Sequence, residues 1–432
     1  MPARWSGARW HARCSFSTRH THEVTRMRLL FITPYLPSPP RFGGQRRLDG
    51  LIRGVAHAND VSLLSLVDPA EDSSDRVRTA LTYCREVKIV PHFRSAAEGL
   101  HKRALQAGSL LSPFSFEHVA YKCSALQAAL DELVAREAFD IIQFEYAQMA
   151  STLTTTSAHI PHVLDEHNVE YDVLRRTAMA EGGLVRKTYN AANWRKLRAE
   201  ERSVWRRFDG TTLTSERDRD LLLEDAPLAR ARVVPNGVDV AEFAPDAQPA
   251  VEPDTVLFFG AINYYPNTDG VLFFLRHVLP KLKMRRPGVR VRIVGQKPPP
   301  EIASWSDPAV EVIGYVDDVR PHIARAAVIV VPLRIGGGTR LKVLEAMAMG
   351  KAIVSTPLGA EGIDVVSGRD VLLGDDADAL VEHLGSVLDS SDLARRLGSA
   401  ARELAAARYS WRASAAILSD FHAELVQSKR AA

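Results

Sequence analysis

The sequence predicts an α/β protein with two Rossmann-like, doubly wound domains that face each other across a cleft. Two arrays of short apolar runs carry this prediction, because helical patterns separate most of the runs, as in parallel sheets covered by helices. Between the arrays lies the segment 241–254, AEFAPDAQPAVEPD, whose prolines, alanines and acids are typical of an interdomain linker. A chain of 432 residues is also long for a single core.

The first array begins with an apolar run that ends in a loop rich in proline and glycine. Gly43 and Gly44 close this loop and open a helix with apolar residues at helical spacing. The strands of this domain, 27–240, are expected at Leu29–Ile32, Val61–Leu66, Val87–Val90, Ile141–Phe144, His162–Leu164, Thr211–Thr214 and Arg232–Val234.

The second array, 255–408, repeats the pattern, and a helix over 409–432 follows it. This last helix carries one apolar stripe that begins at Trp411. The strands of the second domain are expected at Val256–Phe259, Val289–Val294, Val310–Ile313, Val328–Val331, Ala352–Val354 and Val371–Leu373.

Residues 1–26 differ in composition from the rest and are expected to be a disordered extension, with Met27 as the start of the functional protein. They hold five arginines and one glutamate, so without them the formal net charge falls from +3 to −1. They lack the apolar core of a signal peptide. Because the body of the chain is balanced in charge, we do not expect nucleic acid as a partner.

The composition, 46% hydrophobic and 25% charged, is that of a globular protein. No apolar run approaches the roughly 18–20 residues that span a bilayer. The three cysteines, Cys14, Cys84 and Cys123, have no paired spacing, which indicates a reducing compartment and neither a disulfide framework nor a zinc site. We therefore expect a cytoplasmic protein.

The segment 331–362, VPLRIGGGTRLKVLEAMAMGKAIVSTPLGAEG, is the most informative part of the chain. A strand ends at Pro332, three glycines follow, Thr339 is expected to cap a helix that continues to about Met349, and Gly350 is expected to stop it. Glycines let a backbone approach a ligand, and a helix start presents unpaired N–H groups. Such a turn predicts a ligand at the start of the helix.

Two cations lie in the first turn of this helix, where they oppose the helix dipole. Arg340 and Lys342 therefore indicate a bound anion, and Glu345, one turn further, can accept hydrogen bonds from a diol. The alternative is a tight turn whose basic side chains are solvated. Leu341, Leu344 and Ala348 form the inward stripe, which leaves Lys342 and Glu345 at its edge and favours a diphosphate site with a ribose beside it.

The chain also resembles family 4 glycosyltransferases, which have the GT-B architecture of two facing Rossmann-like domains. The segment 331–362 resembles their donor site, and matching pieces follow in the expected order over nearly all of residues 27–411. These pieces are MRLLFITPYLPSPPRFGG at Met27, DIIQFEY at Asp140, VLDEHNVEY at Val163, VVPNGVD at Val233, FFGAINYYPN at Phe258, IVGQKP at Ile293 and GYVDD at Gly314.

The resemblance implies a glycosyltransferase that uses a nucleotide-diphosphate sugar, with no further cofactor and with the last helix crossing back onto the first domain. It implies that Tyr315 and Val316 cradle the base and that Glu345 binds the ribose; for Tyr315 the alternative is an aromatic residue that caps the core. The amides of Gly338 and Thr339, with Arg340 and Lys342, take the diphosphate. Since ligands of such sheets lie beyond the carboxyl ends of strands, the loop from Gly260 to Asn267 is also assigned to the donor site.

Two departures from the family pattern stand out. The first glutamate of the usual pair would fall at Gly337, so one contact to the sugar is missing. The usual basic pair after the first strand of the second domain is also absent, because GAINYYPN occupies that loop. Arg340 and Lys342 are the expected substitutes for this charge.

In the first domain, the cleft is expected to be faced by Gly43, Gly44, Glu145, His167 and Asn168. The glycines can offer amides to a phosphate, and His167 can hydrogen-bond the donor sugar near the reacting carbon. Glu145 is expected either to orient the acceptor or only to pair with a nearby base. For His167 the alternative is a structural loop histidine.

The expected chemistry is cleavage of a sugar–diphosphate bond, with charge developing on the leaving diphosphate. Arg340, Lys342 and backbone amides stabilise that charge without a metal ion. The one metal-like triplet, Asp376-Ala377-Asp378, is better explained by helix capping. By resemblance, the anomeric configuration is retained, and a diphosphate oxygen takes the acceptor proton.

A basic helical stretch over 186–208 holds Trp194 and Trp205 among arginines and lysines. It is expected either to be a solvated face or to rest on the anionic inner surface of the cell membrane, where lipid-linked acceptors occur. The expected partners are thus a nucleotide-sugar donor and a glycan or lipid-linked acceptor, with a peripheral membrane contact if the second alternative holds.

Two other functions remain open from the sequence: a sugar-nucleotide epimerase on the same architecture and a non-catalytic nucleotide-sugar binding protein. The missing glutamate at Gly337 argues against the first and supports the second. A dinucleotide oxidoreductase is disfavoured, because the turn after Leu29–Ile32 lacks a GxGxxG pattern.

Overall fold

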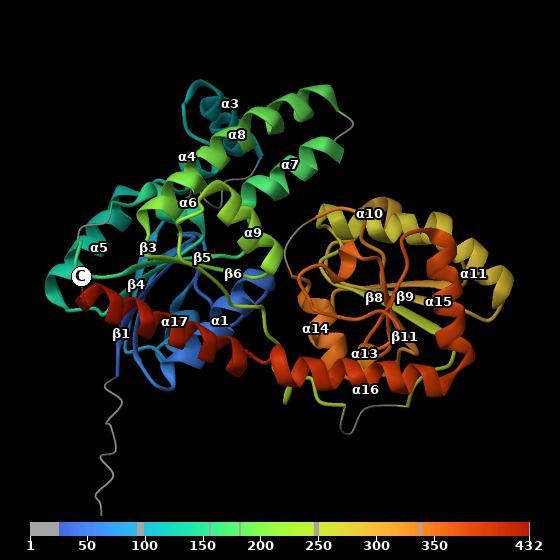
Figure 1. Ribbon diagram of the computed structural model, residues 1–432. Coiled ribbons are helices and arrows are strands. Elements are labelled where there is room, and N and C mark those ends of the chain that lie inside the picture. The colour runs from blue at the N-terminus through green and yellow to red at the C-terminus, as the bar shows by residue number, and fades with distance from the viewer. Residues whose placement is uncertain are drawn as a thin grey trace, which may run out of the picture.

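The computed structural model describes residues 26–92, 99–154, 157–180, 183–245, 250–336 and 339–431. In these ranges the chain forms two α/β domains, each with a parallel sheet between helices (Figure 1). The predicted fold class is confirmed, and Gly337 and Gly338 lie outside the described residues.

The first domain has the strand order β3-β2-β1-β4-β5-β6-β7, with neighbouring strands parallel. Its strands are β1 Arg28–Thr33, β2 Asp60–Val67, β3 Glu86–Pro91, β4 Ile141–Glu145, β5 His162–Glu166, β6 Gly210–Leu213 and β7 Ala231–Val233. Its helices are α1 Gly43–Ala56, α2 Ser74–Ala80, α3 Gly99–Leu111, α4 Phe116–Tyr121, α5 Ser124–Arg136, α6 Ala147–Thr152, α7 Glu170–Ala180, α8 Leu184–Arg207 and α9 Glu216–Asp225.

The second domain has the order β10-β9-β8-β11-β12-β13, again parallel. Its strands are β8 Thr255–Phe259, β9 Arg290–Val294, β10 Val310–Gly314, β11 Val328–Val331, β12 Ile353–Ser355 and β13 Leu372–Leu373. Its helical elements are α10 Tyr265–Phe273, the π-helical turn Phe274–Val278, α11 Leu279–Arg285, α12 Pro300–Ala303, α13 Arg320–Arg325, α14 Leu341–Ala348, the 3₁₀ turn Leu358–Ala360, α15 Ala377–Asp389 and α16 Ser391–Arg408.

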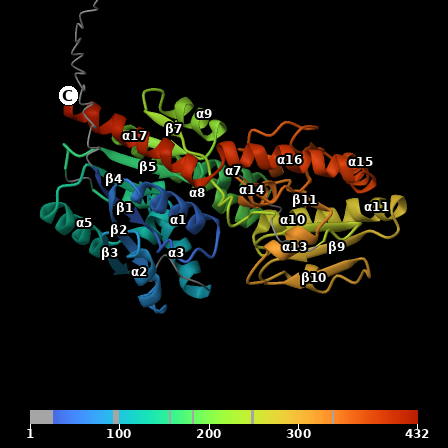
Figure 2. The same ribbon diagram turned by 90° about the horizontal axis from the view of Figure 1, so that it is seen from below.

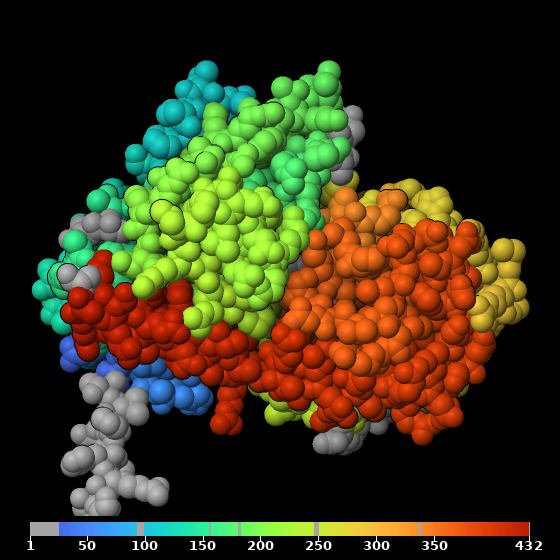
Figure 3. Space-filling model, viewed as in Figure 1, coloured from blue at the N-terminus to red at the C-terminus, as the bar shows by residue number. Residues whose placement is uncertain are grey.

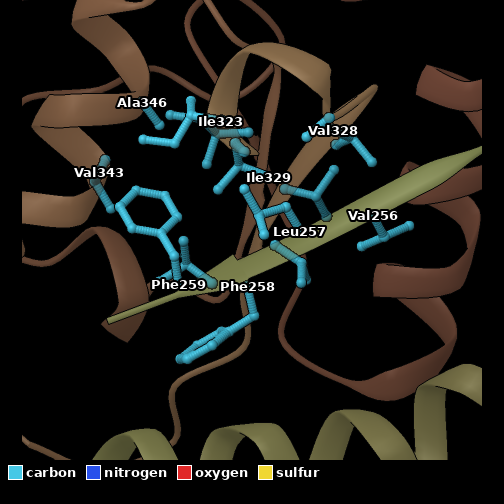
Figure 4. Packing of buried hydrophobic residues seen from close by; sticks show 14 of the residues in the cluster. Val256, Leu257, Phe258, Phe259, Ile323, Val328, Ile329, Val343 and Ala346 are labelled. Atoms are coloured by element: carbon cyan, nitrogen blue, oxygen red, sulfur yellow. The ribbon is translucent and has the colours of Figure 1, made fainter. Parts of the chain in front are cut away.

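The central strands are apolar along their whole length because helices cover both of their faces. Every residue of β8 and β11 is buried, and the core around them also takes in Ile323, Val343 and Ala346 from the covering helices (Figure 4). Because these strands are buried, their carboxyl ends lie at defined positions. The residues that follow those ends form the site.

The last helix, α17 Trp411–Ala431, returns to the first domain and packs against α1 (Figures 1 and 2). In the space-filling view, the helices coloured red run along one edge of both domains (Figure 3). The chain passes between the domains at a narrow joint, where Val238 pairs with Ser410 in a β-bridge and the Trp411 ring lies against Gly50 and Gly237.

The start of α14 corrects one prediction. Thr339 does not cap the helix: the residue before Leu341 is Arg340, and the Thr339 hydroxyl instead donates to the carbonyl of Thr214 in the first domain, 3.4 Å away. The stop at Gly350 is as predicted, since Gly350 has φ +64°, which favours glycine.

Candidate functional site

A cavity of about 820 Å³ lies between the two domains, at the carboxyl ends of their strands. In the second domain it opens between β8 and β11, where the strand order reverses and an open α/β sheet leaves a crevice. Most of the predicted site residues line it: Gly43, Gly44, His167, Asn168, Gly260, Asn267, Tyr315, Val316, Thr339, Arg340, Lys342 and Glu345.

Lys342 is held in one position by its neighbours. Its Nζ donates to Asn267 Oδ1 at 2.8 Å and lies 4.2 Å from the centre of the Phe258 ring, while Asn267 Nδ2 donates to the Ala261 carbonyl at 2.7 Å. Burial, together with the positive charge of Arg340, lowers the pKa of Lys342 to about 7. A lysine whose pKa lies near 7 is partly neutral at that pH, and its amine takes up a proton when an anion binds.

Arg340 is almost fully buried, and a Cβ placed on Gly336 would lie 3.0 Å from its Nη2. Burial lowers the pKa of Arg340 as well. Gly336 has φ +112°, so the first glycine of the predicted turn is needed for the backbone conformation and for the space that the guanidinium fills.

Glu345 faces the first domain. Its carboxylate forms an ion pair with Arg46 of α1, and the two side chains are 9% and 38% exposed. The sequence did not point to Arg46, because charged helix residues are usually solvated. Arg46 thus brings a positive charge of the first domain to the residue that was expected to bind the ribose.

Tyr315 and Val316 lie on the wall of the cavity, after β10. The Tyr315 side chain is 70% exposed, so it does not cap the core and is open to a ligand. Gly260 has φ +138°, and a Cβ there would lie 2.8 Å from Lys342 Nζ, so only glycine leaves room for this lysine.

His167 lies in the cavity wall of the first domain, and a buried chain of hydrogen bonds stands behind it. Glu145 does not face the cleft as predicted: it is 1% exposed and its Oε2 is 2.9 Å from His167 Nε2. Gln143 Nε2 donates to Glu145 Oε1 at 2.8 Å, and Gln143 Oε1 lies 2.7 Å from Nε2 of His422 on α17.

Burial determines the protonation states of Glu145 and His167 in this hydrogen-bond network. It raises the pKa of Glu145 well above the ordinary value, to which nearby Asp165 adds, and it lowers the pKa of His167 to about 3. A protonated Glu145 can donate to Nε2 of a neutral His167, and in that arrangement the ring hydrogen is on Nδ1.

The charge of the nearby Asp165 carboxylate is neutralised by a buried ion pair. Arg47 is 1% exposed and donates to both carboxylate oxygens of Asp165, at 2.8 and 2.6 Å, and to Val234 O and Asn236 Oδ1. Burial alone would raise the pKa of Asp165, but Arg47 brings it to about 2. This pair joins α1, β5 and the chain leading to the second domain.

Arg47 was missed by sequence reasoning, although a signal was present. It lies four residues before Leu51, on the same face as the apolar stripe of α1, and a charged residue on a buried stripe requires a buried partner. Tyr146 was also missed; its φ of +69° brings its ring into a stack on His167, 3.9 Å between centres.

Glu145, Asp165 and His167 are the cluster, among the described residues, whose potential ligand atoms gather within 4.8 Å. Arg47 already occupies the Asp165 carboxylate, and Glu145 is engaged by Gln143, so these groups are satisfied by protein. Asp376 caps α15 by accepting from the amide of Ala379 at 2.9 Å, which agrees with the capping explanation.

The aromatic residues of α8 are placed differently from the membrane prediction. Trp205 is 1% exposed, and its Nε1 donates to Glu166 Oε1 at 3.0 Å. Trp194 is half-buried against the core of the first domain. Over the part of the chain that the structure describes, no helix is long and apolar enough to cross a bilayer.

Comparison with known proteins identifies the two domains. Residues 43–242 match Glycosyltransferase Family 4, and residues 253–390 match Glycosyl transferases group 1.

Two relatives come from Mycolicibacterium smegmatis. A phosphatidyl-myo-inositol mannosyltransferase is 35% identical over 41% of this chain and 48% of the relative, so the match spans about half of that protein. A GDP-mannose-dependent α-(1-6)-phosphatidylinositol monomannoside mannosyltransferase is 25% identical over 70% of this chain and 87% of the relative.

Solved structures show the same fold. Sucrose-phosphate synthase from Thermosynechococcus elongatus superposes with a TM-score of 0.67 at 17% identity, over 93% of this chain and 100% of that one. Anabaena HepE in complex with UDP has a TM-score of 0.63 at 12% identity, over 92% and 100%. With both domains matched in sequence and the two-domain fold shared, the chain belongs to the family 4 glycosyltransferases of the GT-B fold.

Proposed function

We propose that this glycosyltransferase takes a sugar from a nucleotide-diphosphate donor and transfers it to a lipid-linked or glycan acceptor, with retention and without a metal ion. The observation that carries the proposal is the convergence of Arg340, Lys342 and Glu345 on one cavity at the strand-order reversal of the second domain. Two cations fit a diphosphate, and an adjacent carboxylate fits the diol of a ribose.

Lys342 and Arg340 act on the leaving group in this mechanism. When the bond between the sugar and the diphosphate breaks, negative charge grows on the diphosphate oxygen, and fixed cations stabilise it there. Both side chains are largely removed from water, which strengthens their interaction with the developing charge. The amides at Gly43 and Gly44 open α1 toward the same cavity and can add hydrogen bonds.

His167 acts on the sugar. The buried chain behind it keeps Nε2 as an acceptor for the Glu145 proton, which leaves Nδ1–H as the donor to a sugar hydroxyl. A neutral histidine adds no repulsion to the positive charge of an oxocarbenium-like transition state. In a retaining reaction the leaving diphosphate oxygen takes the acceptor proton, so His167 needs no acid–base role.

The wall that the first domain contributes to the cavity indicates the kind of acceptor. Arg41 and Arg46 line its wall in the first domain, next to Phe42. A basic wall with an exposed aromatic ring fits an acceptor that carries a phosphate. Both mannosyltransferase relatives are named for phosphatidylinositol acceptors, which supports a lipid-linked acceptor for this chain as well.

The donor site is tested by a thermal-shift screen with UDP, GDP, ADP and their sugars, including GDP-mannose and UDP-glucose. We expect one nucleotide to raise the melting temperature in a concentration-dependent way, because a ligand that binds only the folded state stabilises it. A Lys342→Ala variant, with Lys281→Ala as a matched surface control, should lose the shift. Equal shifts in both variants, or none in the wild type, would remove the assignment.

A further inference from the structure

A line of polar side chains crosses the apolar layer between the first sheet and α17. Gln143 and Glu145 lie two residues apart on β4, so they point to the same face of the sheet, and this is the face that α17 covers. His422 meets them from α17, which runs beside β4 (Figures 1 and 2). All three side chains are at most 1% exposed. We call His422, Gln143 and Glu145 the buried relay.

Apolar side chains alone would pack this layer, so the relay needs another explanation. The other buried residues on this side of α17 are mostly apolar: Ala415, Leu418, Phe421, Leu425 and Val426. An imidazole among them is unfavourable unless its hydrogen bond is made, and Nε2 of His422 lies 2.7 Å from Gln143 Oε1. The relay then continues to Glu145 at 2.8 Å and to Nε2 of His167 at 2.9 Å, so it ends at the wall of the cavity.

His422 determines the direction of the hydrogen bonds in the relay. Burial lowers the pKa of His422 to about 3, so the ring is neutral and carries one hydrogen. Nδ1 of this ring has no hydrogen-bond partner among the described residues. This favours the hydrogen on Nε2, because an N–H at Nδ1 would be buried without an acceptor. From Nε2 the ring donates to Gln143 Oε1, which orients the Gln143 amide.

The orientation of this amide bears on the proton positions at the cavity. With Oε1 toward His422, Nε2 of Gln143 donates to Glu145 Oε1, which leaves the proton of the Glu145 carboxyl for Oε2. Oε2 is the oxygen next to His167 Nε2, so His167 accepts there and keeps its hydrogen on Nδ1. With the amide turned over, every bond would reverse, and Nδ1 of His167 would be an acceptor.

We propose that His422 is a positioning residue for sugar transfer: through the buried relay it selects the tautomer of His167 that carries its hydrogen on Nδ1. This inference rests on the proposed role of His167 at the donor sugar. An ion pair of 2.7 Å between Lys429 and Asp209 anchors the end of α17 to the first domain and so helps to hold His422 in place. The last helix thus contributes to the site as well as to the packing of the first domain.

The tautomer of His167 in the free protein is the direct test. In protein labelled with ¹⁵N in the histidine rings, NMR distinguishes Nδ1–H from Nε2–H, and the variant His167→Asn identifies the signals. We expect Nδ1–H in wild type. His422→Leu fills the layer without a donor and should lose this preference. His422→Gln should keep it, since Nε2 of glutamine is as many bonds from the backbone as Nε2 of histidine.

Steady-state kinetics separates positioning from a structural effect. We expect His422→Leu to lower kcat at least tenfold and to leave the donor KM within twofold, while His422→Gln keeps kcat within threefold of wild type. Gln143→Leu should lower kcat as much as His422→Leu, and the double variant no further, because both changes break one relay. His118→Leu, at a buried histidine of α4 bonded to Ser151, is the matched control and should have wild-type rates.

The tautomer and the kinetics can each overturn the proposal. A His167 that carries Nε2–H in wild type, or that has the same tautomer in His422→Leu as in wild type, would show that His422 does not select it. Losses that add in the double variant would mean that His422 does not act through Gln143. The nucleotide thermal shift should be the same in all variants. A wild type without that shift would remove the donor assignment and leave the tautomer result unchanged, so the two failures are recognised separately.

Discussion

Lys342 and Glu345 lie one helical turn apart on α14 and line one cavity. Replacing either side chain should therefore lower the turnover and leave the fold intact. We expect Lys342→Ala and Glu345→Ala each to lower turnover at least tenfold, about 1.4 kcal/mol of transition-state stabilisation. Steady-state kinetics with the identified donor measures this. Lys281→Ala, a surface lysine paired with Asp378, should have wild-type rates.

The lowered pKa of Lys342 predicts a pH dependence of donor binding. Below about pH 7 the free enzyme already carries the proton; above it, the lysine is neutral and must take up a proton when the diphosphate binds. Affinity should therefore fall as pH rises beyond 7, by at most tenfold per pH unit. Calorimetry at pH 8 in two buffers of different protonation enthalpy should report uptake of close to one proton.

The control for this prediction is Lys342→Arg. Arginine stays charged throughout the range, so its affinity should be nearly independent of pH and its binding should take up no proton. If the arginine variant shows the same pH dependence as wild type, another group titrates and Lys342 is not responsible.

The protonated state assigned to Glu145 can be tested by an isosteric change. Glutamine keeps an acceptor for Gln143 and a donor for His167, so Glu145→Gln should retain activity within about threefold, whereas Glu145→Ala should lose at least tenfold, about 1.4 kcal/mol. The kcat is the quantity to compare, together with its pH profile. Equal damage in the two variants would show that Glu145 acts as a carboxylate.

Residues such as Arg46, Arg47 and Tyr146 mark the limit of sequence reasoning at this scale. Lys342, Arg340 and Glu345 were predicted because they share one local motif, and Gly43, Gly44 and His167 because they follow strands. Arg46 finds its partner Glu345 in the other domain, and Arg47 finds Asp165 far along the chain. Such pairs form because the fold brings distant segments together, and the spacing of residues along the sequence does not predict them.

Among the elements, the strands were predicted well for a physical reason. Buried parallel strands are continuous apolar runs, and each expected run corresponds to a strand whose ends differ by a residue or two. The start of α14 was predicted wrongly, because the hydroxyl of Thr339 is used between domains, and no local signal distinguishes that use from a cap.

The packing of α17 on α1 leads to a stability prediction. A Cβ on Gly54 would lie 2.3 Å from the Ala415 Cβ, so Gly54→Ala forces the two helices apart, at a cost of about 1–3 kcal/mol. Gly108, also inside a helix, has no atom within 4 Å of such a Cβ. Gly108→Ala should instead stabilise by about 0.5–1 kcal/mol, because alanine is the better helix former.

Denaturant unfolding of the two glycine variants measures this difference directly, since the change in the chain is the same and only the surroundings differ. Opposite signs of the change in unfolding free energy are expected. A Gly54→Ala variant as stable as wild type would mean that α17 does not pack on α1 as closely as these contacts indicate.

At the scale of the whole molecule, the two domains are held together by a small set of polar contacts beside the cavity. Glu361, in the loop after β12, accepts from Arg176 of α7 at 3.2 Å and lies 3.5 Å from Arg217 of α9. Arg176 also donates to the carbonyl of Gly336, at 3.2 Å. These contacts join the first domain to the loop that carries the proposed diphosphate site.

Such partly exposed pairs are each worth about 0.2–1 kcal/mol, which is enough to shift an equilibrium between open and closed domains without unfolding either. Glu361→Ala should therefore favour the open form: small-angle scattering of the free enzyme should give a larger radius of gyration, and the donor KM should rise about two- to tenfold, up to ~1.4 kcal/mol. Raising the salt concentration of the wild type should act in the same direction.

Exchanging the charges of the pair distinguishes a role in closing the domains from a local effect of the substitution at Glu361. The double variant Arg176→Glu and Glu361→Arg restores an attractive pair across the domains but sets each new charge beside a like charge, Asp172 or Arg217. We therefore expect it to recover only a small part of the lost compactness and donor affinity. Asp378→Ala removes a surface pair within the second domain and should change neither quantity. If Glu361→Ala and Asp378→Ala give the same radius of gyration and the same KM, the polar contacts of Glu361 beside the cavity contribute nothing to closure.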